Sequence, residues 1–217
     1  MPADRAIDVA PPQDLLIFPC NGNGLEALDC LGRAYRFVGF VDDAADKQGS
    51  DALGHRVMGR AALAELGHAR VLAVPGSPLS FRSRREVIDG LQIDPLRFAT
   101  VVHPSARVSP LAALGRNVLL MAGVVITSDA VIGDHVCVLP NTVIHHGARI
   151  GPWSLLGANV TIAGSVRIGE NCYVGSGSTL INHVQIGNRA MVGLGSNVIR
   201  DVAPGATVAG NPARVLS

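Results

Sequence analysis

The sequence predicts an α/β domain followed by a parallel β-helix, and three observations support this prediction. An aliphatic residue recurs every six positions in the C-terminal half of the 217-residue chain. Strand-like and helix-like segments alternate before that repeat. The chain also has 25 glycines and only 4% aromatic residues, a composition that suits a fold with many tight turns.

Composition and charge exclude several classes of protein. Hydrophobic residues make up 48% of the chain, which excludes a disordered protein. With 16% charged residues and a net charge of +1, nothing in the electrostatics favours a nucleic acid or a membrane as partner. The four cysteines form no CxxC pair, so we expect reduced thiols and no metal site. Without a signal peptide or an apolar run of about 20 residues, we expect a cytoplasmic protein with a flexible N-terminal tail over residues 1–13.

The repeat is regular over seventeen hexads. Stepping by six from Val102 to Val198 meets only Val, Ile or Leu. A period of six fits no helix, but it fits a coil of short flat strands joined by tight turns, with the aliphatic side chain pointing inward. With three hexads per coil, the segment 99–217 is expected to form about 5.7 coils and a prism roughly 27 Å tall.

The segment 14–98 shows a different pattern, in which buried strands alternate with helices. This alternation predicts a parallel sheet of βαβ units. The expected strands are 15–19, 36–43 and 69–76, and the expected helices are 25–34, 59–67 and 80–91.

Parallel sheets bind ligands at the carboxyl ends of their strands. Three turns stand at those ends here, and the first contains Gly22-Asn23-Gly24, which lacks the third glycine of a dinucleotide motif. A single nucleotide is therefore a better fit than a dinucleotide, and a purely structural turn is the alternative. The candidate ligand residues are Asn21, Gly22, Asn23, Asp42, Asp43 and Gly76.

Acetyl-transfer chemistry is suggested by a resemblance that spans residues 15–215. The α/β start, VVHPSA at 101–106, the hexapeptide run and GNPAR at 210–214 resemble bacterial nucleotide-sugar acetyltransferases of the sialic-acid O-acetyltransferase type. The resemblance implies a Rossmann-like domain, a left-handed β-helix and a homotrimer. It also implies acetyl-CoA between neighbouring β-helices and N-acetylation of a UDP- or GDP-linked amino sugar for bacterial surface glycans.

The resemblance also implies roles for individual residues. The segment VIHHGARIG matches the family's catalytic segment and places the general base at His146, with His145 as a second candidate. The candidate residues at the three strand ends match the family's nucleotide-sugar contacts. Ala163-Gly164 matches the place where the family keeps room for the thioester. The positions that match acetyl-CoA contacts are Leu155, Gly164, Ser176 and Leu194.

The chain departs from the family pattern in three places. Gly147 replaces the acid that usually follows the base, and Leu155 replaces a second histidine. The usual Gly-His-Gly turn reads Gly22-Asn23-Gly24. The first departure leaves His146 without a carboxylate to orient its ring.

The chemistry of acetyl transfer agrees with a histidine base, because the acceptor must lose a proton near neutral pH. No Ser-His-Asp or Cys-His arrangement is evident, so we expect direct attack by the acceptor rather than an acyl-enzyme. Two alternatives remain open. One is a sugar O-acetyltransferase, and the other is a non-catalytic β-helix trimer that serves as a scaffold or ligand sensor, which Gly147 and Leu155 would favour.

Overall fold

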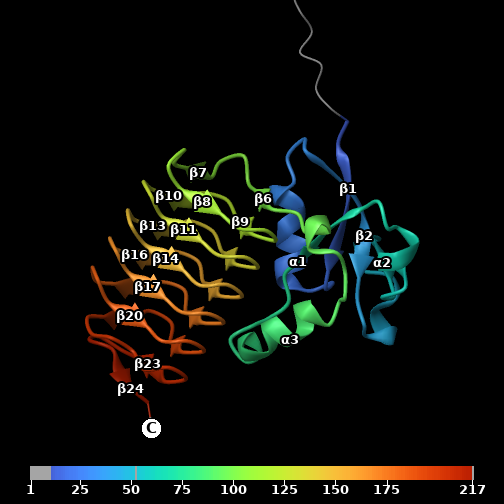
Figure 1. Ribbon diagram of the computed structural model, residues 1–217. Helices are drawn as coiled ribbons and strands as arrows, with labels where there is room; N and C mark the ends of the chain where they lie inside the picture. Colours follow the sequence, from blue (N-terminus) through green and yellow to red (C-terminus); the bar gives the residue numbers. More distant parts are fainter. Residues whose placement is uncertain (1–10, 52, 217) are drawn as a thin grey trace, which may run out of the picture.

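The fold is seen in a computed structural model that describes residues 11–51 and 53–216. Of the tail that we expected over residues 1–13, residues 1–10 lie outside the described part of the chain. The described residues form a mostly parallel sheet with helices, followed by a triangular β-helix (Figure 1). The predicted fold class, an α/β domain followed by a left-handed β-helix, is confirmed.

The N-terminal sheet has five strands in the order β3-β4-β2-β1-β5. Its bounds are β1 (Gln13–Phe18), β2 (Tyr35–Val41), β3 (Gly49–Ser50), β4 (Arg56–Met58) and β5 (Arg70–Ala73). The helices are α1 (Gly22–Glu26), α2 (Ala62–Glu65) and α3 (Arg84–Asp89). Short 3-10 turns span Ala27–Cys30, Ala45–Lys47, Phe81–Ser83 and Pro95–Arg97.

The three expected strands are present, but sequence patterns missed the hairpin of β3 and β4. Strands β3 and β4 have only two and three residues, too few for an alternation of apolar and polar side chains to be recognised. The helices are also shorter than expected, since 25–34 and 80–91 each divide into an α-helix and a 3-10 turn.

The β-helix is a prism with three parallel sheets, named here I, II and III. Sheet I contains β6 (Val101–Val102), β9 (Leu119–Leu120), β12 (Cys137–Val138), β15 (Leu155–Leu156), β18 (Tyr173–Val174), β21 (Met191–Val192), β23 (Thr207–Ala209) and the antiparallel β24 (Arg214–Val215). Sheet II contains β7 (Arg107–Val108), β10 (Val125–Ile126), β13 (Val143–Ile144), β16 (Thr161–Ile162), β19 (Thr179–Leu180) and β22 (Asn197–Val198). Sheet III contains β8 (Ala113–Leu114), β11 (Val131–Ile132), β14 (Arg149–Ile150), β17 (Arg167–Ile168) and β20 (Gln185–Ile186).

Strand pairing fixes the coil length at eighteen residues. Ile126 pairs with Ile144, and Ile144 with Ile162, so each aliphatic residue of the repeat lies against its equivalent one coil away. The aliphatic column forms the prism core, as predicted. Val102 is the exception, with 37% of its surface exposed, because no coil lies above the first one.

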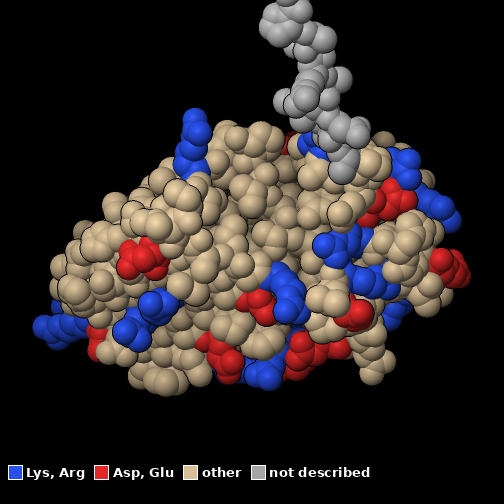
Figure 2. All heavy atoms as spheres, turned by 45° about the horizontal axis from the view of Figure 1, so that its top comes forward, with Lys and Arg blue, Asp and Glu red and all other residues tan. Residues whose placement is uncertain are grey.

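The N-terminal domain covers sheet I. In Figure 1, α1 lies between the N-terminal sheet and the β-helix, and α2 lies on the far side. Leu15 and Ile17 of β1, Ala27, and Leu119 and Leu155 of sheet I belong to one buried cluster. Figure 2 shows charged side chains crowded over the N-terminal domain, whereas the visible face of the β-helix is mostly uncharged.

Candidate functional site

His145 and His146 lie in the turn between β13 and β14, on the corner of the prism where sheets II and III meet. His146 is exposed and His145 is partly buried. Because the coil length is eighteen, the same position of this corner is occupied by Gly164 and Asn182 in the next two coils. The predicted base therefore belongs to a column of side chains that runs along one edge of the prism.

Gly164 makes room for the ring of His146. A Cβ atom added at Gly164 would lie 2.6 Å from both Cε1 and Nε2 of the imidazole and 3.1 Å from Nδ2 of Asn182. The sequence led us to expect that Ala163-Gly164 leaves room for a thioester. In the structure the imidazole occupies the space above Gly164.

Gly147 adopts a left-handed conformation, with φ of 66°. Its N–H donates to Oδ1 of Asp129, at 3.0 Å, one coil earlier. That carboxylate caps the turn, and within residues 11–51 and 53–216 the His146 ring has no hydrogen bond or ion pair. The missing acid at position 147 is therefore not replaced by another carboxylate of the same described chain.

A hollow of about 400 Å³ begins beside the histidine corner. It extends from Ala163 and Asn182 across sheet II to Asn211 of the GNPAR segment. The exposed aliphatic residues Ile181 and Ile199 line it. Three asparagines also belong to its lining: Asn182, Asn197 and Asn211. Asn182 and Asn211 were not predicted, although stepping by eighteen from His146 would have found Asn182.

The residues predicted to contact acetyl-CoA do not lie together in one chain. Ser176 and Leu194 lie on the corner between sheets I and II, whereas Gly164 lies on the corner between sheets II and III. Leu194 is 66% exposed. Leu155 is only 3% exposed and packs under the N-terminal domain, so we leave it out of the proposed site.

The carboxyl ends of the N-terminal strands do come together, as predicted. Strand β1 pairs in parallel with β2 on one side and with β5 on the other, so the order in which the strands are added to the sheet reverses beside β1. Such a switch point is where open α/β sheets bind ligands. Nδ2 of Asn23 donates to the carbonyls of Val74 (3.4 Å) and Gly76 (3.3 Å), which joins the turns after β1 and β5.

The two predicted glycines of this crevice differ in their surroundings. Nothing lies within 4 Å of a Cβ atom added at Gly22. Gly76 has φ of 115°, and an added Cβ would lie 2.9 Å from Cγ of Arg84. Gly22 therefore borders open space. At Gly76 a side chain would collide with Arg84, so this position requires glycine. Asn21 caps α1, since its side chain accepts the N–H of Gly24 at 2.8 Å.

Asp42 and Asp43 have different environments. Asp42 is 4% exposed, and its carboxylate accepts hydrogen bonds from the N–H of Cys20 (3.0 Å), the N–H of Ala44 (2.9 Å) and Nζ of Lys47 (3.0 Å). These bonds hold together the loops after β1 and β2, so Asp43 is the more accessible of the two predicted ligand carboxylates. Asp43 is half exposed and forms a two-bond ion pair with Arg60.

The two halves of the predicted site lie on different sides of the prism. The N-terminal domain covers sheet I, and the histidine corner joins sheets II and III. In a triangular prism that corner is opposite the face formed by sheet I. A nucleotide sugar held by the N-terminal domain therefore cannot reach His146 of the same chain without passing around the prism.

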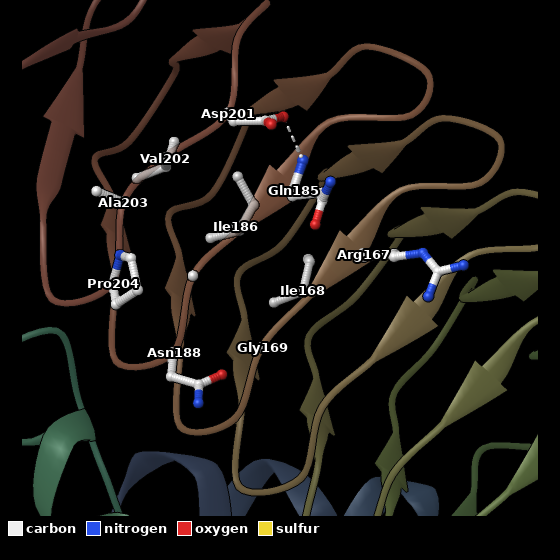
Figure 3. Close-up of a pocket in the computed structure, with 11 residues that line it drawn as sticks. Arg167, Ile168, Gly169, Gln185, Ile186, Asn188, Asp201, Val202, Ala203 and Pro204 are labelled. Atoms are coloured by element: carbon white, nitrogen blue, oxygen red, sulfur yellow. Dashed lines mark hydrogen bonds between the residues drawn. The ribbon is translucent and has the colours of Figure 1, made fainter.

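A larger hollow of about 580 Å³ lies on sheet III and contains none of the predicted residues. Figure 3 shows Arg167 and Gln185 along it, with the Gln185 N–H donating to Asp201. Across the described segments, no three His, Cys, Asp or Glu side chains form a metal-binding group. None of the helices in those segments has the length and hydrophobicity needed to cross a membrane.

Comparisons with known sequences detect the repeat. The family of the bacterial transferase hexapeptide (six repeats) matches residues 111–146 and 129–164. The family of the hexapeptide repeat of succinyl-transferase matches residues 165–200. No curated protein matches the chain.

Comparisons with solved structures extend over nearly the whole chain. The acetyltransferase domain of PglB from Neisseria gonorrhoeae is 27% identical with a TM-score of 0.81, covering 94% of this chain and 100% of its own. PerB from Caulobacter crescentus, solved with CoA and GDP-perosamine, is 29% identical with a TM-score of 0.80, covering 99% and 100%. WeeI from Acinetobacter baumannii, at 21% identity, a TM-score of 0.81 and coverage of 94% and 99%, shows the fold alone.

These similar structures point to a different type of acetyltransferase from the one that the sequence led us to expect. PglB contributes an acetyltransferase domain, and the Caulobacter enzyme is a perosamine N-acetyltransferase. They therefore do not support the sialic-acid O-acetyltransferase type in particular. The six-residue repeat, the coil of eighteen residues and these similarities support the broader family. Over residues 111–200 the chain carries the hexapeptide repeat of bacterial transferases, and over nearly its whole length it is similar to the acetyltransferase domain of PglB and to the perosamine N-acetyltransferase.

Proposed function

We propose that this chain transfers the acetyl group of acetyl-CoA to the amine of a UDP- or GDP-linked amino sugar destined for bacterial surface glycans. The observation that carries the proposal is the exposed His146 ring, which lies over Gly164, the neighbour of Ala163 in the lining of the hollow. The similarity to PerB, solved with CoA and GDP-perosamine, supports the same pair of substrates. A histidine variant of the perosamine enzyme, in which alanine replaces histidine, has also been solved with both ligands.

The proposed role of His146 is proton transfer. The Cε1–Nε2 edge of its ring reaches over Gly164, so we assign Nε2 as the atom that takes the proton of the attacking amine. Acetyl-CoA supplies an activated acetyl group as a thioester. The new carbon–nitrogen bond forms as the carbon–sulfur bond breaks, and the proton held by His146 can pass to the departing sulfur.

A homotrimer would unite the separated halves of the site. Except for Arg107, the outward residues of the sheet II strands are uncharged. Ile181 and Ile199, which directly follow β19 and β22, are 48% and 47% exposed. Sheet III instead carries Arg149 and Arg167 on adjacent strands. We therefore place sheet II toward a threefold axis, because burying like charges would be unfavourable.

This arrangement makes different corners of neighbouring copies meet. The His146 corner of one copy would lie beside the corner of the next copy that carries Ser176 and Leu194. The N-terminal domain of that next copy covers its sheet I, so its crevice would lie on the same side as His146. The acetyl-CoA contacts predicted from sequence would then come from two copies around one groove.

The activity is tested by following thiol release from acetyl-CoA with a panel of UDP- and GDP-linked sugars. Turnover with 4-amino or other amino sugars, and none with the corresponding hydroxyl sugars, is the expected result. Turnover with hydroxyl sugars alone would instead indicate O-acetylation. Binding without turnover of any sugar would indicate a non-catalytic scaffold or sensor and would overturn the proposal.

The shared site is tested by mixing two inactive variants. His146→Ala removes the base, and Gly22→Trp fills the crevice at a position with open space around it. Random trimers of the two should regain about a quarter of wild-type activity, because each groove needs an intact corner and an intact neighbouring domain. A site within one copy would regain none. Gly67→Trp, at an exposed position after α2, is the matched control for the added bulk.

A further inference from the structure

Arg84 is the largest fully buried side chain among the residues that the structure describes, with 1% of its surface exposed. It is the first residue of α3. Its guanidinium donates three hydrogen bonds, all to backbone carbonyls: Nη1 to Pro75, Nε to Trp153 at 2.8 Å and Nη2 to His135 at 2.7 Å. One carbonyl belongs to the loop after β5, and the other two belong to adjacent coils of the β-helix.

The charge of Arg84 has no carboxylate partner in the described part of the chain. Burial lowers the pKa of its guanidinium, although an arginine stays charged at neutral pH. What arginine supplies here is a rigid planar fork that can bind three carbonyls in fixed directions.

The loop that Arg84 holds is the loop that borders the proposed nucleotide-sugar crevice. The bare Cα of Gly76 packs on Cγ of Arg84, where an added Cβ would lie at 2.9 Å. Asn23, from the turn after β1, donates to the carbonyl of Gly76 at 3.3 Å. The turn after β1 and the loop after β5 form the two sides of the crevice. The position of both therefore depends on where residues 75 and 76 lie.

A second contact fixes the same strand end to the β-helix. The Asn117 side chain donates to the carbonyl of Ala73 at 2.8 Å and accepts its N–H at 2.7 Å. Asn117, His135 and Trp153 occupy the same corner position in three successive coils, all with positive φ between 54° and 62°. The corner between sheets III and I therefore presents a column of polar groups to the end of β5.

We infer that Arg84 is a positioning residue for the nucleotide-sugar half of the site. It holds the Pro75–Gly76 loop against the β-helix and so keeps the crevice between β1 and β5 in the shape that a nucleoside diphosphate requires. The identity of the ligand rests on the proposed function. The hydrogen bonds of Arg84 to Pro75, His135 and Trp153 are independent of the proposed function.

The test uses the full chain with UDP, GDP and CoA as probes in isothermal titration. Arg84→Met keeps the length of the side chain but removes its donors, and Arg84→Lys keeps the charge but not the fork. Arg84→Met should weaken binding of UDP or GDP at least about tenfold and change CoA binding by less than about twofold. Arg84→Lys should fall between wild type and Arg84→Met. Arg85→Met, at the exposed neighbour that stacks on Trp153, should bind all probes like wild type.

Hydrogen exchange provides a readout that does not depend on a ligand. Amides of residues 74–80 should exchange faster in Arg84→Met, with no change in sheet II. Unchanged nucleotide binding, or equal weakening of nucleotide and CoA, overturns the inference. Wild-type protein that binds neither UDP nor GDP overturns the proposed nucleotide substrate and this inference together. Should Arg84→Met not fold, a nucleotide affinity of Arg84→Lys equal to that of wild type overturns it.

Discussion

Gly164 and His146 are complementary in shape: a Cβ atom added at Gly164 would lie 2.6 Å from Cε1 and Nε2 of the imidazole. The glycine therefore determines where the proposed base can lie. Because the clash is with the end of a side chain, the fold can accept a substitution here by moving the ring.

Gly164→Ala should accordingly reduce activity while the protein stays folded. We expect kcat to fall about tenfold or more, since displacing a catalytic group by about 1 Å can cost that much or more. The melting temperature should change little. Steady-state kinetics and a thermal melt on the same preparation check both parts. Wild-type kcat in the alanine variant would show that the ring position seen here is not the active one.

His146→Ala should lose at least about 100-fold in kcat, the lower limit for a general base, while substrates still bind. His145→Ala should lose far less, because His145 precedes the corner position and is partly buried. The comparison is made in one assay with one substrate pair. The assignment of the base is wrong if His146→Ala retains more than about a tenth of wild-type kcat, because removal of a general base usually costs about 100-fold or more.

Gly147→Glu should shift the acid limb of the kcat/KM profile to higher pH. A carboxylate beside His146 favours the protonated imidazole, so a higher pH is needed to obtain the neutral base. The turn accepts a side chain, because Asp129, Ser165 and His183 occupy the equivalent place with φ of 51°, 60° and 68°. Gly147→Gln is the uncharged control and should leave the profile in place. An identical shift in both variants would exclude the electrostatic explanation.

Asp42 and Asp43 should respond differently to substitution. Asp42→Ala leaves the N–H groups of Cys20 and Ala44 without their acceptor, which should lower the free energy of unfolding by about 1–3 kcal/mol. Asp43→Ala removes an exposed ion pair and should affect stability little, but it should raise KM for the nucleotide sugar. Denaturant melts and steady-state kinetics separate the two effects. Equal destabilisation would contradict the assignment.

His135 should make the domain interface sensitive to acid. Burial lowers the pKa of His135 below the usual value of about 6.5 for histidine, and its Nδ1 lies 3.0 Å from Nδ2 of Asn117. Below about pH 6.5 the unfolded chain binds a proton that the folded chain resists, so stability should fall as the pH drops from about 7 toward 5. His135→Gln should show a smaller fall. Melting temperatures across that range, compared with wild type, measure the difference.

The sequence by itself determined the β-helix, because its core is built from a local repeat. An inward aliphatic residue every six positions specifies the strand, the turn and the neighbour one coil away, so the register follows from counting. The same counting places His146 on a corner and brings Gly164 and Asn182 into its column. The strand-end turns of the N-terminal domain also followed from local patterns, because parallel strands carry their carboxyl ends to one edge.

The tertiary structure showed which face of the prism the N-terminal domain covers. The inward repeat is the same on all three faces, so it could not show that Leu155 is buried in the interface. The outward residues of sheet I, Val101, Leu119, Cys137, Leu155, Tyr173 and Met191, do form an apolar column when read at steps of eighteen. The burial of Asp42 and the three carbonyl bonds of Arg84 likewise depend on segments far apart in sequence. Such contacts follow from packing between domains, which no local period encodes.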